Sequence, residues 1–204
     1  LMTPEEHIRA LNEKPELLKS CGRPAIDTQV EIRDENDNPL PIGEIGQICA
    51  KGPQIMKGYW NKKEESEKAL KGGWMHTGDA GRMDEEGFVF IQDRIKDMIV
   101  SGGENIYSTE VEAALFAHPD VVDAAVIGVP DEKYGEVVKA CIVKKEGSNV
   151  TEADLISFCK DRIASYKKPQ SVDFIDEVPR NASGKVLKKV LREPYWKDQE
   201  RQVS

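Results

Sequence analysis

The sequence predicts an α+β protein in which a β-rich, barrel-like subdomain is followed by a small α+β domain with a three-stranded sheet and flanking helices. Before about residue 94, short strand patterns alternate with frequent Gly and Pro, as is typical of small β-barrels. After this point, amphipathic helix patterns alternate with longer apolar runs that suit buried strands. We therefore place a domain boundary at Arg94 to Lys96 and expect domains at residues 1–94 and 95–204.

The elements of the first domain are predicted from segments with different periodicities. Residues 4–19 carry scattered apolar residues that suggest short helical pieces, and residues 29–33 alternate strictly between polar and apolar, as a half-buried strand does. Residues 45–50 predict a second strand. Residues 61–70 are rich in helix formers and nearly free of apolar side chains, so an exposed helix is expected there. The apolar run Phe88–Ile91 predicts a strand that enters the core.

The second domain is predicted from alternating helix and strand patterns. Thr109 and Glu112 have the spacing of a capping box, so a helix should begin there and end near His118. Nearly continuous apolar runs predict two central strands, at residues 121–129 and 137–143. The later predicted elements are a helix capped by Thr151, a strand at residues 172–175 and a basic helical turn at residues 186–192.

The charge balance argues against nucleic acid as the main partner. The formal net charge is −8, from 29 basic and 37 acidic residues, whereas a surface that binds nucleic acid backbone is normally strongly basic. From residue 160 onward the balance reverses, with 11 Lys and Arg against 7 Asp and Glu. This surplus could favour a phosphorylated small molecule, and a solvated helical surface is the simpler alternative.

The cysteines and the apolar runs indicate the cellular compartment in which we expect the protein. The four cysteines form no CxxC pair and have no His at metal-ligand spacing, so no metal site is predicted and reduced thiols in the cytoplasm are expected. No run of about 18 apolar residues predicts a transmembrane segment, and the N-terminus lacks a signal-peptide pattern. The chain has no glycine-rich phosphate loop, and it begins at Leu1 in what we expect to be the middle of a longer protein.

Four ordered blocks of residues carry a resemblance to a known family. They are residues 73–79 (GWMHTGD), 93–99 (DRIKDMI), 101–105 (SGGEN) and 179–185 (PRNASGK). In order and spacing they resemble the C-terminal third of the adenylate-forming, AMP-binding enzymes, and within them the acyl-CoA synthetases. The resemblance covers about residues 22–192. It implies that the first domain is the C-terminal β-rich subdomain of a truncated large AMP-binding domain, and that the second is the small C-terminal domain.

The resemblance assigns Asp79 and Arg94 to the nucleotide. A carboxylate held in the Thr-Gly-Asp turn can accept hydrogen bonds from both ribose hydroxyls, and the planar guanidinium of Arg94 suits ribose or phosphate oxygens. By their residue types alone, Asp79 could instead cap its turn and Arg94 could be a salt-bridge partner at the hinge. Two positions after Arg94, the resemblance places the hinge pivot at Lys96, which could otherwise be an ordinary exposed lysine.

The resemblance assigns adenylation to Lys185 and the coenzyme A tunnel to Gly102, Gly103 and Glu104. A mobile ammonium can bridge the substrate carboxylate and the α-phosphate of ATP while negative charge builds between them. An exposed lysine in a glycine turn is the simpler alternative for Lys185, and a plain hairpin turn is the alternative for the two glycines. The same lysine is expected to be a target of a lysine acetyltransferase and deacetylase.

These assignments predict part of an ATP-dependent acyl-CoA synthetase that joins a fatty or aryl acid to coenzyme A through acyl-AMP. Its substrates would be the carboxylic acid, ATP and CoA, with Mg²⁺ bound in the missing N-terminal domain, so this polypeptide alone should be inactive. The alternatives are an amino-acid-activating or luciferase-like adenylating enzyme, and a non-catalytic module that binds a nucleotide or a partner. The acid itself is not predicted, because its pocket belongs to the missing domain.

Overall fold

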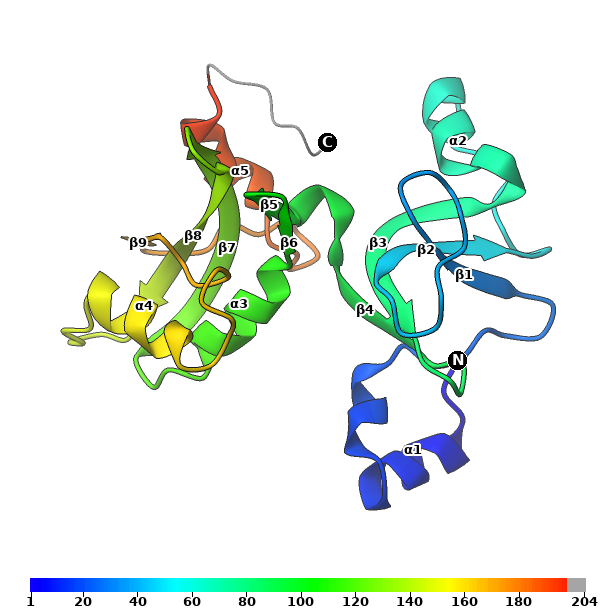
Figure 1. Cartoon of the computed structure of the whole chain (residues 1–204), viewed down its shortest axis with the longest axis horizontal. Coiled ribbons are helices and arrows are strands. Elements are labelled where there is room, and N and C mark those ends of the chain that lie inside the picture. Colours follow the sequence, from blue (N-terminus) through cyan, green and yellow to red (C-terminus); the bar gives the residue numbers. More distant parts are fainter. Residues whose placement is uncertain (198–204) are drawn as a thin grey trace. The chain divides into compact units, whose positions relative to one another are not determined.

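The computed structural model describes residues 1–197, and its chain divides into two compact units, Leu1–Ile95 and Lys96–Ser204 (Figure 1). Each unit combines short helices with a sheet in which neighbouring strands are mostly antiparallel, which confirms the predicted α+β class. The units are described separately below.

The first unit is built on a four-stranded antiparallel sheet with the strand order β1-β2-β3-β4. Its strands are β1 (Gln29–Arg33), β2 (Gly46–Lys51), β3 (Met75–Met83) and β4 (Val89–Arg94). The sheet is open, with β1 and β4 at its edges, so the expected barrel-like form is not a closed barrel. Four short strands are too few to close, since even the small OB-type barrel uses about five.

The two faces of this sheet are buried by alternate residues of the chain around β4. Phe88 and Phe90 pack with Ala10 and Leu17 from the N-terminal helical segment. Val89 points to the opposite face, where it joins a second small core with residues of β1 and β2. Alternation along the strand therefore gives each face of the sheet its own apolar cluster.

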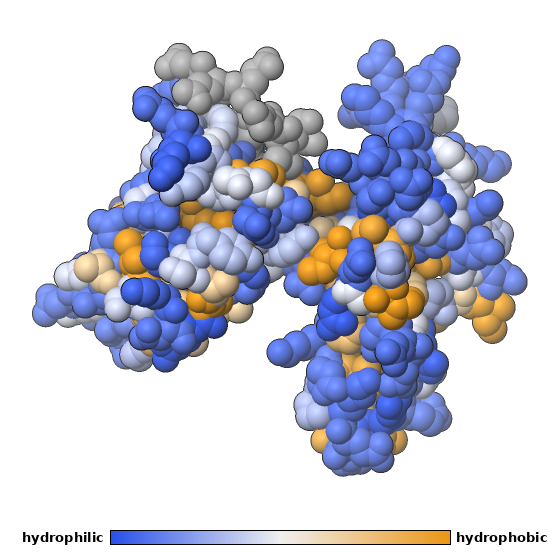
Figure 2. All heavy atoms as spheres, in the orientation of Figure 1, coloured by the Kyte–Doolittle hydropathy of each residue, from blue (hydrophilic) through white to orange (hydrophobic). Residues whose placement is uncertain are grey.

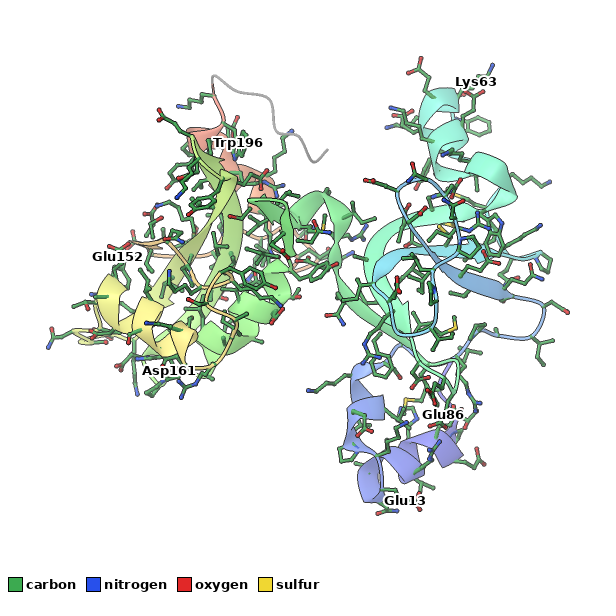
Figure 3. All side chains as sticks on the ribbon, viewed as in Figure 1. Glu13, Lys63, Glu86, Glu152, Asp161 and Trp196 are labelled. Atoms are coloured by element: carbon green, nitrogen blue, oxygen red, sulfur yellow. The ribbon has the colours of Figure 1, made fainter. Side chains whose placement is uncertain are left out.

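The helices of the first unit follow local capping and turn chemistry. They are α1 (Pro4–Asn12), η1 (Pro15–Lys19), α2 (Lys63–Ala69) and η2 (Lys71–Gly73), where η marks a 3₁₀ turn. Thr3 caps α1 by a reciprocal capping box with Glu6. Helix α2 has no buried residue, as predicted, and its surface is hydrophilic in Figure 2. Glu86, labelled in Figure 3, ties the β3–β4 turn to α1 because its carboxylate accepts hydrogen bonds from Arg9 and Lys14.

Between Lys96 and residue 197, the described part of the second unit, there are five strands rather than the three that the sequence predicted. They are β5 (Ile99–Ser101), β6 (Glu104–Ile106), β7 (Val121–Asp131), β8 (Gly135–Lys144) and β9 (Ser171–Phe174). The order is β6-β5-β8-β7, and β9 pairs with β8 in parallel. The two additional strands, β5 and β6, have three residues each, which is too short to show a period of two in the sequence.

Helices cover both faces of the second sheet. The elements are η3 (Ile95–Asp97), α3 (Ser108–Phe116), α4 (Glu152–Lys160), α5 (Lys188–Arg192) and η4 (Glu193–Tyr195). Helices α3 and α4 bury Leu115 and Leu155 against Val126 of β7 in the main core. On the other face, Leu191 of α5 packs with the smaller cluster around Ile127. Alternate residues of β7 thus pack into two separate apolar cores, one on each face of the sheet.

Two helix starts test the predicted caps. Thr151 caps α4, as the sequence predicted, and the structure adds a capping box with Asp154. The box at Thr109 and Glu112 is wrong, because the N-cap of α3 lies two residues earlier, at Tyr107, and makes no side-chain cap. Glu112 is turned inward instead, where its Oε1 accepts a hydrogen bond of 2.9 Å from the backbone amide of Val126.

Candidate functional site

Asp79 and Arg94 are brought together by the pairing of β3 with β4. Their Cα atoms are directly opposite in the antiparallel register, and Arg94 Nε lies 2.8 Å from Asp79 Oδ1. The side chain of Asp79 is 25% exposed and that of Arg94 is 50% exposed. The pair is therefore a cross-strand ion pair that faces solvent, and both groups can reach a ligand.

Thr77 and Gly78 lie inside β3, where the register with β2 shifts just before Asp79. Thr77 Oγ1 donates to the carbonyl of Ile48 at 2.8 Å and accepts from the amide of Asp79 at 3.1 Å. Gly78 has φ of +75°, a conformation that an L side chain rarely adopts. The Thr-Gly-Asp segment is therefore an irregularity within β3 and not the turn that the sequence predicted, and it fixes the position of the Asp79 carboxylate within the strand.

The segment after Arg94 joins the two units at Lys96. Lys96 is exposed in η3, and its carbonyl accepts a hydrogen bond of 3.3 Å from Arg192 Nη1 of α5. The same guanidinium lies 2.9 Å from Oδ1 of Asp97, and both of these side chains are largely buried. Asp97 and the carbonyl of Lys96 are therefore anchored to the body of the second unit, and the hinge role of Lys96 stays a prediction.

Gly102 and Gly103 form the two-residue turn between β5 and β6. Ser101 pairs with Glu104, and the glycines have φ of +60° and +86°. Two positive φ values at the centre of a two-residue hairpin loop favour glycine strongly. Gly102 also donates to the carbonyl of Tyr134 at 2.9 Å, so the turn is attached to the β7–β8 connection. The geometry is that of a hairpin, and the tunnel role of Gly102, Gly103 and Glu104 stays a prediction.

Lys185 lies in an exposed turn that begins at Arg180. The ammonium of Lys185 has no hydrogen-bond or ion-pair partner within residues 1–197, so it is available to an anionic ligand. The structure shows a turn with internal hydrogen bonds here, which we describe below. Asn181 accounts for most of them, and its position before Ser and Gly is a recognisable turn signal.

One group of described residues has the chemistry of metal ligands. Asp37, Cys49 and His76 offer ligand atoms that lie within 4.8 Å of one another. However, Arg33 and Lys71 each place a cationic nitrogen 3.5 Å from the Asp37 carboxylate. Burial also raises the pKa of the Cys49 thiol to about 11, so this thiol stays protonated at neutral pH. The group is better described as a polar contact inside the first unit than as a cation site.

Among the described residues, no helix has both the length and the apolar character needed to cross a membrane.

The family comparisons confirm the resemblance to the AMP-binding enzymes. The model of the AMP-binding enzyme family matches residues 5–60, and that of the AMP-binding enzyme C-terminal domain matches residues 110–185. Feruloyl-CoA synthase from Amycolatopsis sp is 44% identical over 88% of this chain and 37% of its own length. Long-chain-fatty-acid–CoA ligase from Escherichia coli O157:H7 is 43% identical over 85% of this chain and 31% of its own length. The chain therefore spans about a third of the length of the curated relatives that it matches.

Solved structures give the same result for the fold. ATP-bound MatB from Rhodopseudomonas palustris matches with a TM-score of 0.82 and 40% identity, over 88% of this chain and 36% of that chain. The o-succinylbenzoate CoA synthetase MenE from Bacillus subtilis, in complex with its acyl-adenylate intermediate, matches with a TM-score of 0.82 and 38% identity, over 98% of this chain and 38% of that chain. The chain thus belongs to the AMP-binding family of adenylate-forming enzymes and corresponds to its C-terminal part.

Proposed function

We propose that the full-length protein containing this chain is an ATP-dependent acyl-CoA synthetase. The observation that carries the proposal is that the two units present different charged groups. One unit presents a fixed carboxylate and guanidinium, Asp79 and Arg94, and the other presents the exposed Lys185. Such separable groups suit a reaction in which one nucleotide site serves two successive steps.

In the first step, a carboxylate oxygen of the acid attacks the α-phosphorus of ATP, and the bond to the pyrophosphate leaving group breaks. Asp79 would hold the ribose hydroxyls and Arg94 would contact the nucleotide beside them. Lys185 would lie between the attacking carboxylate and the α-phosphate, where it offsets the negative charge of the transition state. Mg²⁺, expected in the part of the family fold outside this chain, would neutralise charge on the departing pyrophosphate.

In the second step, the thiol sulfur of CoA attacks the acyl carbonyl carbon, the thiol proton is released, and the bond to AMP breaks. The second unit would turn about Lys96 between the steps, so that Lys185 withdraws and the Gly102–Gly103 hairpin approaches the thiol. The ion pair between Asp97 and Arg192 supports this assignment. It fixes Asp97 to the second unit, so that this unit would turn as one body about the preceding residue, Lys96.

The acid is proposed to be a fatty or aryl acid, since relatives of this chain are named as ligases of long-chain fatty acids, ferulate and 2-succinylbenzoate. A panel of these three acids with MgATP, assayed for pyrophosphate release and then for the thioester after addition of CoA, tests the proposal. Acid-dependent pyrophosphate release followed by a thioester supports it. Pyrophosphate release without a thioester would favour a different acceptor, and no release with any acid would favour a non-catalytic module.

Two further features are proposed on the same basis. The exposure of Lys185 makes its ammonium accessible to a lysine acetyltransferase, and acetylation would remove the charge that adenylation requires. The four cysteines are free thiols, three of them buried, which supports a cytoplasmic location. Mass spectrometry of the protein purified from its own cells would test the first feature.

A further inference from the structure

The segment that carries Lys185 is a closed turn with its own backbone hydrogen bonds. The amide of Leu187 donates to the carbonyl of Pro179 at 2.8 Å, and the amide of Asn181 donates to the carbonyl of Lys185 at 2.9 Å. The amide of Gly184 then donates to the carbonyl of Asn181 at 2.9 Å, with Gly184 at φ of +79°. The backbone of Lys185 is therefore part of a short hairpin rather than of an irregular loop.

The side chain of Asn181 closes the inside of this turn. Its Oδ1 accepts hydrogen bonds from the amide of Ser183 at 3.0 Å, the hydroxyl of Ser183 at 2.8 Å and the amide of Lys185 at 2.9 Å. One acceptor atom thus fixes two backbone amides, one of them that of the lysine itself. Asn and Asp are the residues whose short side chains make such contacts within a turn.

Arg180 attaches the turn to the sheet. Its Nη2 donates to both carboxylate oxygens of Asp123 on β7, at 3.0 and 2.8 Å, and its Nη1 donates to the carbonyl of Gly184 at 3.0 Å. The guanidinium therefore bridges β7, an edge strand of the sheet, and the residue immediately before Lys185. A planar group with donors on both sides is suited to this bridging role, and a lysine could not make all three contacts.

The residues that follow the turn are also fixed to the second unit. Lys188, the first residue of α5, places its ammonium 2.7 Å from Glu112 Oε1 of α3 and also donates to Ser108. The side chains of Lys188 and Glu112 are only 10% and 17% exposed. The turn is thus anchored to the body of the second unit on both sides.

We propose that Arg180 and Asn181 are positioning residues for Lys185, which hold its backbone in a preformed turn fixed to β7. This inference rests on the proposed adenylation role of Lys185 and adds how the lysine reaches its place. The consequence is that the base of Lys185 moves with the whole second unit, and only its side chain samples other conformations. Ordering the backbone before the reaction lowers the entropy lost when the ammonium meets its ligand.

The first test measures the turn itself and does not depend on catalysis. Amide hydrogen exchange of the peptide containing Ser183 and Lys185 is followed in the full-length protein and in Asn181→Leu and Asn181→Asp. Leucine removes the acceptor, so exchange of these amides should accelerate about tenfold, in line with the loss of hydrogen bonds of ordinary strength. Aspartate keeps an acceptor oxygen and should preserve the protection. Exchange that is equally fast in all three proteins would overturn the proposal.

The second test asks whether the turn serves adenylation. Asn181→Leu and Arg180→Met should each slow pyrophosphate exchange by roughly tenfold, since misplacement of a catalytic group by a small distance is costly. Conversion of supplied acyl-AMP to acyl-CoA should not change, and Asn181→Asp should restore exchange. Asn149→Ala, at an exposed asparagine of another loop in the same unit, is the control that should leave both half-reactions unchanged.

The two tests separate the inference from the function on which it rests. Equal slowing of both half-reactions by Asn181→Leu, or full activity despite rapid exchange of the turn, would show that the turn does not position Lys185. Slow pyrophosphate exchange in Asn181→Leu together with full activity in Lys185→Ala would overturn the adenylation role of the lysine instead.

Discussion

Replacement of Asp79 by Asn distinguishes a structural carboxylate from one that binds ribose. In the structure Asp79 Oδ1 forms an ion pair with Arg94 Nε at 2.8 Å, and half of the Arg94 side chain is exposed. A pair this exposed contributes about 0–1 kcal/mol to the free energy of unfolding. Because asparagine has the same shape, the melting temperature should fall by no more than about 4–8 °C for a unit of this size.

In the same variant, nucleotide recognition should be weakened more than the folded state is destabilised. Each hydrogen bond to a charged acceptor contributes about 1.5–3 kcal/mol, and asparagine keeps one acceptor oxygen while losing the other and the charge. The value of kcat/KM for ATP in pyrophosphate exchange should therefore fall roughly 10- to 150-fold. Asp161→Asn, which removes one exposed charge from the second unit, serves as the matched control.

The reasoning would be refuted in either of two ways. An unchanged kcat/KM for ATP in Asp79→Asn would mean that the carboxylate only pairs with Arg94. A loss of stability well beyond the value of an exposed ion pair would mean that Asp79 holds the β3–β4 pairing together, and the lost activity would then report unfolding.

Two other predictions follow from the hinge and from the N-terminal helix. Lys96→Pro should reduce thioester formation far more than pyrophosphate exchange, because proline fixes φ near −65° and restricts rotation at the boundary; equal loss of both would point to misfolding. Hydrogen bonds from Arg9 and Lys14 lower the pKa of Glu86 from 4.5 to about 2, so its stabilising effect is complete above pH 4.5 and is lost as the pH falls towards 2. Glu86→Gln should therefore unfold more readily than the parent at pH 7 and match it near pH 2 in acid titrations followed by circular dichroism; a constant difference across this range would contradict the assignment.

The longer elements of the fold were predictable because each has a strong local signal. The exposed helix α2 follows from a segment without apolar residues, and β7 and β8 follow from continuous apolar runs. The start of α4 follows from the reciprocal hydrogen bonds of Thr151 and Asp154. In these cases the residues that decide the structure lie next to one another in the chain.

The elements that sequence patterns missed depend on distant partners. Glu112 has the spacing of a capping residue, but the amide of Val126 and the ammonium of Lys188 draw it into the interior. The short strand β5 is defined by its pairing with β6 and β8 and has no period of its own. Whether the first sheet closes into a barrel likewise depends on whether its edge strands, β1 and β4, pair with each other.

The sequence predicts the residues of the candidate site but not the contacts that hold them in place. The four sequence blocks point to Asp79, Arg94 and Lys185, whose roles stay predictions, and the structure adds the ion pair between the first two. The contact of Arg180 with Asp123 joins residues 57 positions apart, so no local pattern signals it. The turn around Lys185 is ordered by polar contacts, which the absence of apolar residues does not reveal.

The adenylation role of Lys185 is tested most directly by comparing both half-reactions in Lys185→Ala of the full-length protein. Loss of one electrostatic catalytic group costs about 2.7–4 kcal/mol, so pyrophosphate exchange should fall by about 10² to 10³. Conversion of supplied acyl-AMP to acyl-CoA should stay at the rate of the parent, and Lys189→Ala, at an exposed lysine four residues later, should leave both rates unchanged. Normal pyrophosphate exchange in Lys185→Ala, or an equal fall in both half-reactions, would contradict the account.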